Sequence, residues 1–161
     1  LKNQLIQAIS AIEFATKINK KLRYHINATR VETNGLPVYN NIKGLFSELP
    51  TDKFELVEHE WYDKEEFLSV CNEMDIGLQV SFSETFNIVS ADLLSQGVPI
   101  VGSKEIPWSS FVFNADPNSS RDISNKLLFS YKMPQVNVAL NQFNLKNYTN
   151  KTKKIWYKYF F

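Results

Sequence analysis

The sequence predicts an α/β domain with a mainly parallel sheet and helices on both of its faces. Short apolar runs alternate along the chain with segments whose apolar residues recur at helical spacing. This alternation favours parallel strands joined by helical crossovers. Acidic residues follow the apolar run 76–80, where an open α/β sheet would present them at its ligand-binding edge.

The first half of the chain is expected to hold three helices and two strands. In order, these are a helix carrying Leu5, Ile9 and Ile12, a strand at 23–26, a helix at 36–49, a strand at 54–57 and a helix after Asp63. Asp63 and Glu66 have the spacing of a capping box, which places the start of the third helix.

The second half continues the same pattern and then becomes helical. The expected elements are a strand at 76–80, a helix at 86–96, a strand at 98–102, a short strand at 111–113, a helix at 118–131 and one or two helices over 136–161. Pro134 is expected to end the helix at 118–131. Residues 135–161 would then form a C-terminal helical tail.

The composition is that of an ordinary globular domain. Of the 161 residues, 43% are hydrophobic and 22% are charged, and the net charge of +1 gives no field that would indicate nucleic acid or a membrane. No apolar run is long enough to predict a transmembrane segment. Cys71 is the single cysteine, so a reducing compartment is favoured and we expect a cytoplasmic protein.

The most informative segment is Ser81–Ser103, S-F-S-E-T-F-N-I-V-S-A-D-L-L-S-Q-G-V-P-I-V-G-S. It resembles the donor-site motif of retaining, GT-B fold glycosyltransferases of family 4, which is usually written E-x-F-G-x-x-x-x-E before a G-x-P-V-V segment. Here E-T-F-N ends at Asn87, where the family usually has glycine, and Asp92 stands in place of the second glutamate. A carboxylate is present at both ends of the motif.

The resemblance covers Lys2 to about Ile106 and implies a Rossmann-like domain, the C-terminal half of a GT-B enzyme. It implies retaining transfer of a sugar from a nucleotide-diphosphate sugar to a glycan or other acceptor, without a metal or other cofactor.

Parallel α/β domains normally begin with a strand, and none precedes the first helix here. We therefore expect residues 1–161 to be one nucleotide-sugar-binding domain of a longer enzyme whose N-terminal domain binds the acceptor. Alone, the chain is expected to bind donor weakly and to transfer no sugar.

Glu84 is the candidate catalytic residue, and the resemblance implies that it orients the donor sugar by accepting hydrogen bonds from its hydroxyls. Asp92 would hold the ribose diol. The remaining donor-binding candidates are Lys2, Asn27, Trp61, Ser83, Thr85, Phe86, Asn87 and Ile88. Each has an ordinary structural alternative, such as a solvated carboxylate or a helix start.

Several of these candidates carry a more specific expectation. The amides of 86–88 would face the diphosphate at a helix N-terminus, while the side chains of Phe86 and Ile88 are expected to pack. Lys2 would neutralise the diphosphate. Asn27 and Trp61 follow strands, where the family lines its nucleoside pocket, although a Trp is more often packed in a core than stacked on a base.

The sequence was also searched for a metal site and for alternatives to a glycosyltransferase. His59 and Glu60 have no second histidine or cysteine at ligand spacing, so no metal site is expected. Two alternatives to a glycosyltransferase stay open. One is a non-catalytic Rossmann-like module that binds a nucleotide or a partner, and the other is a small receiver-type regulatory domain.

Overall fold

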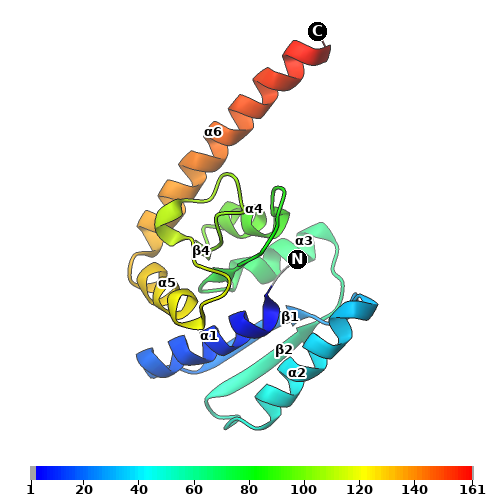
Figure 1. The fold of residues 1–161 in the computed structure, drawn as a ribbon, viewed down its shortest axis with the longest axis vertical. Helices are drawn as coiled ribbons and strands as arrows, with labels where there is room; N and C mark the ends of the chain where they lie inside the picture. Colours follow the sequence, from blue (N-terminus) through cyan, green and yellow to red (C-terminus); the bar gives the residue numbers. More distant parts are fainter. Residues whose placement is uncertain (1–2, 161) are drawn as a thin grey trace.

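The computed structural model describes residues 3–160 and confirms the alternation of helices and strands (Figure 1). The elements are α1 (Gln4–Ile18), β1 (Leu22–Asn27), η1 (Thr33–Gly35), α2 (Leu36–Ser47), β2 (Phe54–His59), α3 (Lys64–Asn72), β3 (Gly77–Leu78), α4 (Ile88–Ser95), β4 (Ile100–Val101), η2 (Phe111–Phe113), α5 (Ser120–Lys132) and α6 (Pro134–Phe160). Within these residues, none of the helices is both long and apolar enough to cross a bilayer.

The strands pair in parallel, as predicted. β1 lies beside β2 with Leu22 opposite Phe54, and β3 lies beside β4 with Gly77 opposite Ile100. Among the described residues the hydrogen bonds form two separate two-stranded ladders, not one continuous sheet. Parallel pairing directs the carboxyl ends of both strands in a ladder to one edge, and the loop that carries Glu84 leaves that edge of β3.

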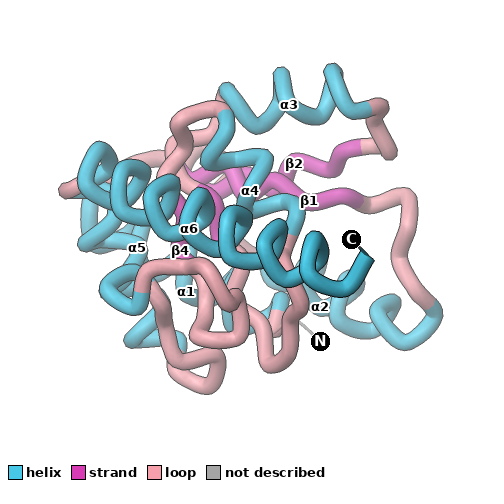
Figure 2. The backbone as a smooth tube through the Cα atoms, turned by 90° about the horizontal axis from the view of Figure 1, so that it is seen from above, coloured by secondary structure: helices cyan, strands magenta, loops and turns pink. Residues whose placement is uncertain are grey.

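Helices cover both faces of the strands, which confirms the predicted fold class. On one face, α1, α2 and α5 contribute to the core clusters that contain Ala11, Phe46 and Ile123. On the other face, α3, α4 and α6 meet around Leu93 and Trp108. Figure 2 shows the same layering, with the strands between α3 above and α1 with α2 below.

Helix α1 joins the two ladders. Its buried face carries Ala8, which packs beside β1, and Phe14, which packs beside Val80 after β3. The buried Gln7 accepts a hydrogen bond from the Val80 N–H at 2.9 Å. The predicted apolar stripe was therefore partly wrong, because Ile9 is 42% exposed and small alanines make the contact instead.

Two further predictions are corrected by the structure, those for residues 111–113 and for the two strands on either side of α4. Residues 111–113 form a 3₁₀ turn in which the Phe113 N–H donates to Ser110, so the predicted strand is wrong. The expected end of the preceding helix before Pro134 is confirmed, since α5 ends at Lys132, and the expected tail is the single helix α6, which begins at Pro134. Proline is common at the first position of a helix, because the backbone N–H that it lacks would have no acceptor within the helix. The strands predicted at 76–80 and 98–102 shorten to two residues each.

Candidate functional site

The carboxylate of Glu84 is held in place by its own loop. Its Oε1 accepts the Thr85 N–H at 3.1 Å, and its Oε2 accepts the Asn87 side-chain N–H at 3.0 Å. Glu84 is half-buried. Because each carboxylate oxygen can accept more than one hydrogen bond, the two internal donors orient the group and still leave acceptor capacity for a ligand.

Asn87 performs two tasks at the start of α4. Its φ of 61° lies in the left-handed region, which explains how it replaces the glycine of the resembling motif. Its Oδ1 caps the helix by accepting the Ser90 N–H at 2.9 Å, while its Nδ2 donates to Glu84. A glycine could supply the backbone angle but neither of these bonds.

The loop is also anchored on its buried side. The Ser103 hydroxyl donates to the Ser81 carbonyl at 2.9 Å and accepts the Ser81 N–H at 3.1 Å, which joins the ends of β3 and β4. The Trp108 indole N–H donates to the Phe86 carbonyl at 2.6 Å. These bonds fix the loop backbone before and after Glu84.

The predicted residues around the helix start divide into packed and exposed groups. Phe86 packs against Trp108 and Tyr148, as expected. Ile88 is 68% exposed, so the expectation that its side chain packs is wrong. α4 begins at Ile88, two residues later than predicted, and Ser83 and Thr85 are exposed in the loop before it.

Asp92 lies on the side of α4 that faces α3. Burial raises the pKa of its carboxyl, while the nearby Lys64 ammonium acts in the opposite direction. Burial and then the charge of Asp92 raise the pKa of the Cys71 thiol to about 11. No described contact joins Asp92 to Glu84, so their action on one ligand stays a prediction. Glu84 precedes α4, so the two carboxylates do not lie on one helix.

The carboxyl ends of β1 and β2 carry a second group of polar and aromatic side chains. Trp61 is 61% exposed, so the structural alternative in which it packs in a core is wrong, and the Arg30 guanidinium lies 3.7 Å from the centroid of its ring. Arg30 was missed by the sequence analysis. Its position could have indicated a role, because it is a basic residue three positions after the end of the parallel strand β1.

Asn27 organises these loops from within. Its Nδ2 donates to the Glu60 carbonyl at 3.0 Å, and its Oδ1 accepts the N–H groups of Thr29 and Arg30 at 3.3 Å. Its side chain therefore connects the loop after β1 to the loop after β2. Through these hydrogen bonds, Asn27 holds the two loops that carry Trp61 and Arg30.

A pair of stacked histidines near this edge was also not predicted from the sequence. His25 Nδ1 lies 2.7 Å from His59 Nε2, and His59 Nδ1 lies 3.2 Å from the Tyr62 hydroxyl. Burial, followed by the neighbouring His59, lowers the pKa of His25. Within the described part of the chain, no three His, Cys, Asp or Glu side chains gather into a group that could hold a metal ion.

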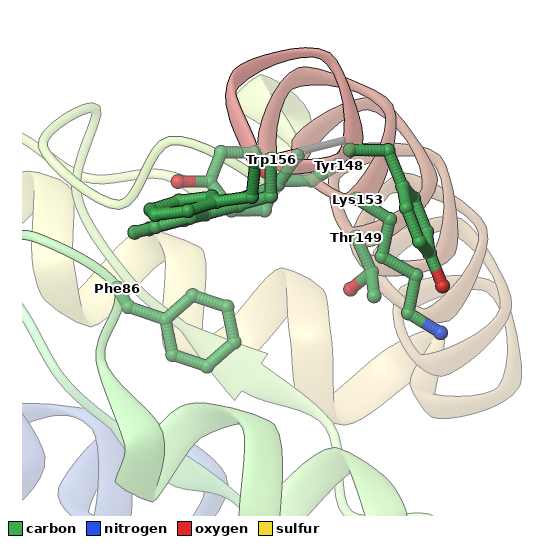
Figure 3. A pocket seen from close by; sticks show the side chains of 8 residues that line it. Phe86, Tyr148, Thr149, Lys153 and Trp156 are labelled. Atoms are coloured by element: carbon green, nitrogen blue, oxygen red, sulfur yellow. The ribbon is translucent and has the colours of Figure 1, made fainter.

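An open concavity of about 770 Å³, which we call the α6 wedge, lies between α6 and the loop before α4 (Figure 3). It is lined by Phe86, Tyr148, Thr149, Thr152, Lys153, Trp156, Tyr157 and Phe160. Neither Glu84 nor Asp92 lines it. Lys2, the remaining predicted donor ligand, lies outside the described residues.

Comparisons with known proteins bear on the fold. No family model matches the sequence, and no curated protein matches it either. Among solved structures, the OtsA apo structure superposes with a TM-score of 0.68 at 13% identity, covering 91% of this chain and 36% of that one. A GtfA/B complex gives a TM-score of 0.62 at 15% identity, covering 95% of this chain and 32% of the other.

These likenesses show that the chain has the α/β architecture of GT-B glycosyltransferases, with parallel strands between helices. The identities are too low to show more than the fold. The chain spans about a third of the length of the two neighbours.

Proposed function

We propose that this chain is the donor-binding part of a retaining glycosyltransferase that uses a nucleotide-diphosphate sugar. The observation that carries the proposal is the oriented carboxylate of Glu84 at the carboxyl end of β3, with internal donors from Thr85 and Asn87. Ligands of open α/β sheets bind at this edge. The likeness to GT-B glycosyltransferases supports the same assignment at the level of the fold.

Glu84 would accept hydrogen bonds from the hydroxyls of the donor sugar. Hydrogen bonds to a charged acceptor are stronger than those between neutral groups, so one carboxylate can fix the orientation of a sugar ring. Asn87 would act as the positioning residue that holds Glu84. Correct orientation of the reacting carbon supplies much of the advantage of such a site.

The diphosphate would lie at the N-terminus of α4. Helix N-termini attract anions through their amide groups and their dipole, and Ile88 at this end is exposed. Lys2 would add a positive charge. Stabilisation of the leaving diphosphate is the electrostatic part of the proposed catalysis and requires no metal ion.

The nucleoside would lie toward the ends of β1 and β2. Trp61 offers an exposed ring for stacking on a base, and the Arg30 guanidinium beside it can contact an anion or a base edge. Asp92 would contact the ribose hydroxyls. The acceptor and a second domain that binds it are also part of the proposal, because this chain covers only 36% and 32% of the two neighbours.

Isothermal calorimetry with a panel of sugar nucleotides and their free nucleoside diphosphates tests the donor role of Glu84. We expect Glu84→Gln to weaken binding of the preferred sugar nucleotide by roughly 10-fold to 100-fold, the range for losing a hydrogen bond to a charged group. Binding of the free nucleoside diphosphate should not change, because Glu84 is assigned to the sugar.

Glu48→Gln is the matched control, since Glu48 is exposed at the end of α2 and the substitution makes the same chemical change. If the wild-type protein binds nucleoside diphosphates with no preference for the sugar-bearing form, the non-catalytic nucleotide module is the better description. Equal affinity of Glu84→Gln and the wild type for the sugar nucleotide would remove the assigned role.

A further inference from the structure

The last turns of α6 project beyond the rest of the fold (Figure 1). We call Lys151–Phe160 the α6 tip. Its large apolar side chains are all exposed: Ile155 by 48%, Trp156 by 56%, Tyr157 by 65%, Tyr159 by 79% and Phe160 by 65%. The Trp156 and Phe160 rings stack on each other with centroids 5.1 Å apart. Such a cluster of aromatic side chains on one helix end indicates an interaction surface.

The apolar side chains of the α6 tip continue the face by which α6 packs on the domain. Asn141, Leu145 and Tyr148 contact the body at spacings of four and three residues. The same spacing leads through Thr152 to Trp156. The face is therefore continuous along α6. The domain covers it as far as Tyr148, and at the α6 tip it is exposed.

Positive charge is concentrated on this helix. α6 carries five lysines, at 146, 151, 153, 154 and 158, and no aspartate or glutamate, whereas the whole chain has a net charge of only +1. Lys151, Lys154 and Lys158 follow one another at spacings of three and four, so they form a stripe beside the aromatic one. Lys153 lines the α6 wedge.

We propose that the α6 tip docks on an anionic lipid surface. Aromatic rings favour the boundary between headgroups and acyl chains, and lysines beside them reach anionic headgroups with their long stems. The charge of α6 complements such a surface, and electrostatic attraction and apolar burial then act together. Flexible acyl chains can also enter the open α6 wedge, whose walls are mainly aromatic.

A second copy of the chain is a poorer occupant of the same face. Two α6 tips placed together would bring lysine stripes of the same sign into contact, which costs free energy. An anionic lipid surface has the opposite charge. This inference does not depend on the proposed transfer of a sugar.

Vesicle flotation with the whole protein tests the proposal. We expect binding to vesicles in which phosphatidylglycerol replaces a third of the phosphatidylcholine, weak binding to phosphatidylcholine alone, and release at high salt. Replacing Lys151, Lys154 and Lys158 together by glutamine should weaken binding roughly 100-fold, because each basic residue near an anionic surface contributes a factor of about five. Trp156→Ser should weaken binding roughly tenfold through lost apolar burial.

Control variants separate these effects from a general change of charge. Lys20, Lys53 and Lys104 are exposed lysines outside α6, and replacing all three by glutamine lowers the net charge by the same amount. Phe111→Ser removes an exposed ring from η2 and serves as the control for Trp156→Ser. Both controls should bind vesicles like the wild type, and circular dichroism should show that all variants are folded.

Three results would overturn the proposal. The first is a folded wild-type protein that does not float with anionic vesicles. The second is binding that is equal for neutral and anionic vesicles and insensitive to salt. The third is a wild-type dimer in size-exclusion chromatography that becomes a monomer on Trp156→Ser, which would assign the α6 tip to a second copy.

Discussion

The two halves of α6 share one continuous face but differ in what that face contacts. In the first half, the fully buried Asn137 accepts the Ile100 N–H at 3.0 Å and donates to the Ile100 carbonyl at 2.7 Å, as a neighbouring strand would. Asn141 accepts the Ser110 N–H at 2.7 Å. In the second half, the α6 tip exposes its aromatic side chains to solvent.

The difference shows that polar side chains, as well as apolar ones, anchor this helix. Asn137 closes the free edge of β4, and Asn141 holds the loop that leads to η2, so the position of α6 along the domain is fixed by directional bonds. A buried polar side chain that satisfies backbone groups is costly to remove. Exposed side chains without such partners should be nearly neutral for stability.

Asn137→Leu should destabilise the protein more than any other substitution considered for α6. The substitution would leave the N–H and carbonyl of Ile100 without partners and would also break the bonds to Ser130 and Asn141. We expect a loss of at least about 3 kcal/mol in the free energy of unfolding, from about 1–3 kcal/mol for each unpaired buried group. Urea unfolding followed by circular dichroism measures this loss.

Asn147→Leu is the control for this prediction, since Asn147 is exposed on the same helix. Its effect should stay within about 0.5 kcal/mol. Similar unfolding midpoints for the two variants would mean that the buried asparagines do not anchor α6.

Asn87 allows a test of intermediate size, because it too bonds backbone from a buried position. Asn87→Ala should cost about 2 kcal/mol, since it removes the cap and forces alanine into the left-handed region. Asn87→Gly should cost less than about 1 kcal/mol, because glycine accepts that backbone angle. Thermal unfolding compares the two variants.

The same two variants, Asn87→Ala and Asn87→Gly, distinguish an effect on ligand binding from an effect on stability. Both variants remove the donor to Glu84, so both should weaken binding of the sugar nucleotide to a similar extent. An effect on binding that followed stability, with alanine much worse than glycine, would mean that Asn87 does not act by positioning Glu84.

Asp92→Asn should have a small effect on stability that depends on pH. Burial raises the pKa of Asp92 in the folded state above the value of about 3.9 expected in the unfolded chain. The folded protein therefore binds this proton more tightly, and ionisation of Asp92 lowers stability as the pH rises through the raised pKa. Asparagine does not ionise.

At neutral pH, Asp92→Asn should consequently unfold at the same temperature as the wild type or a higher one. Below about pH 3.9 the two proteins should become equal. If Asp92 also holds the ribose, calorimetry should show weaker binding of both the sugar nucleotide and the nucleoside diphosphate at neutral pH. A variant that is less stable at pH 7 than the wild type would contradict the stated cause of the pKa shift.

The smallest effect on stability is expected at the α6 tip. Trp156→Ser combined with Phe160→Ser should change the free energy of unfolding by less than about 0.5 kcal/mol, because both side chains are more than half exposed. Differential scanning calorimetry provides the measurement. A loss of 2 kcal/mol or more, on the order seen for buried aromatic residues, would show that this half of α6 is packed in solution and would remove the contrast with the first half.

Local patterns predicted the parts of the fold and site that depend on neighbours in the sequence. The capping box at Asp63 and Glu66 is present, with the Glu66 N–H donating to Asp63 at 2.9 Å. The turn with Glu84 after β3 also follows from the order of apolar and polar residues. Such features involve contacts within a few residues, so their signal is contained in a short window.

The errors occurred where distant contacts decide a residue's environment. Trp61 is exposed because Asn27 and Glu60 hold the loops after β1 and β2 in a shape that leaves its ring at the surface beside Arg30. Residues 111–113 form a turn, and the N–H of Ser110, just before it, is taken by Asn141 from α6. Both contacts join residues more than 30 positions apart, so no local sequence pattern predicts them.

Apart from residues 111–113, the order of helices and strands could be predicted from the sequence alone, as could the parallel pairing and the place of Glu84 at the carboxyl edge of β3, because these follow from periodicity, turn chemistry and the geometry of crossovers. The roles of two asparagines became visible only in the folded chain, where Asn87 both caps α4 and holds Glu84, and Asn137 completes the edge of β4. An amide side chain can accept and donate in many directions, and the backbone groups placed around it by the fold select which bonds it makes.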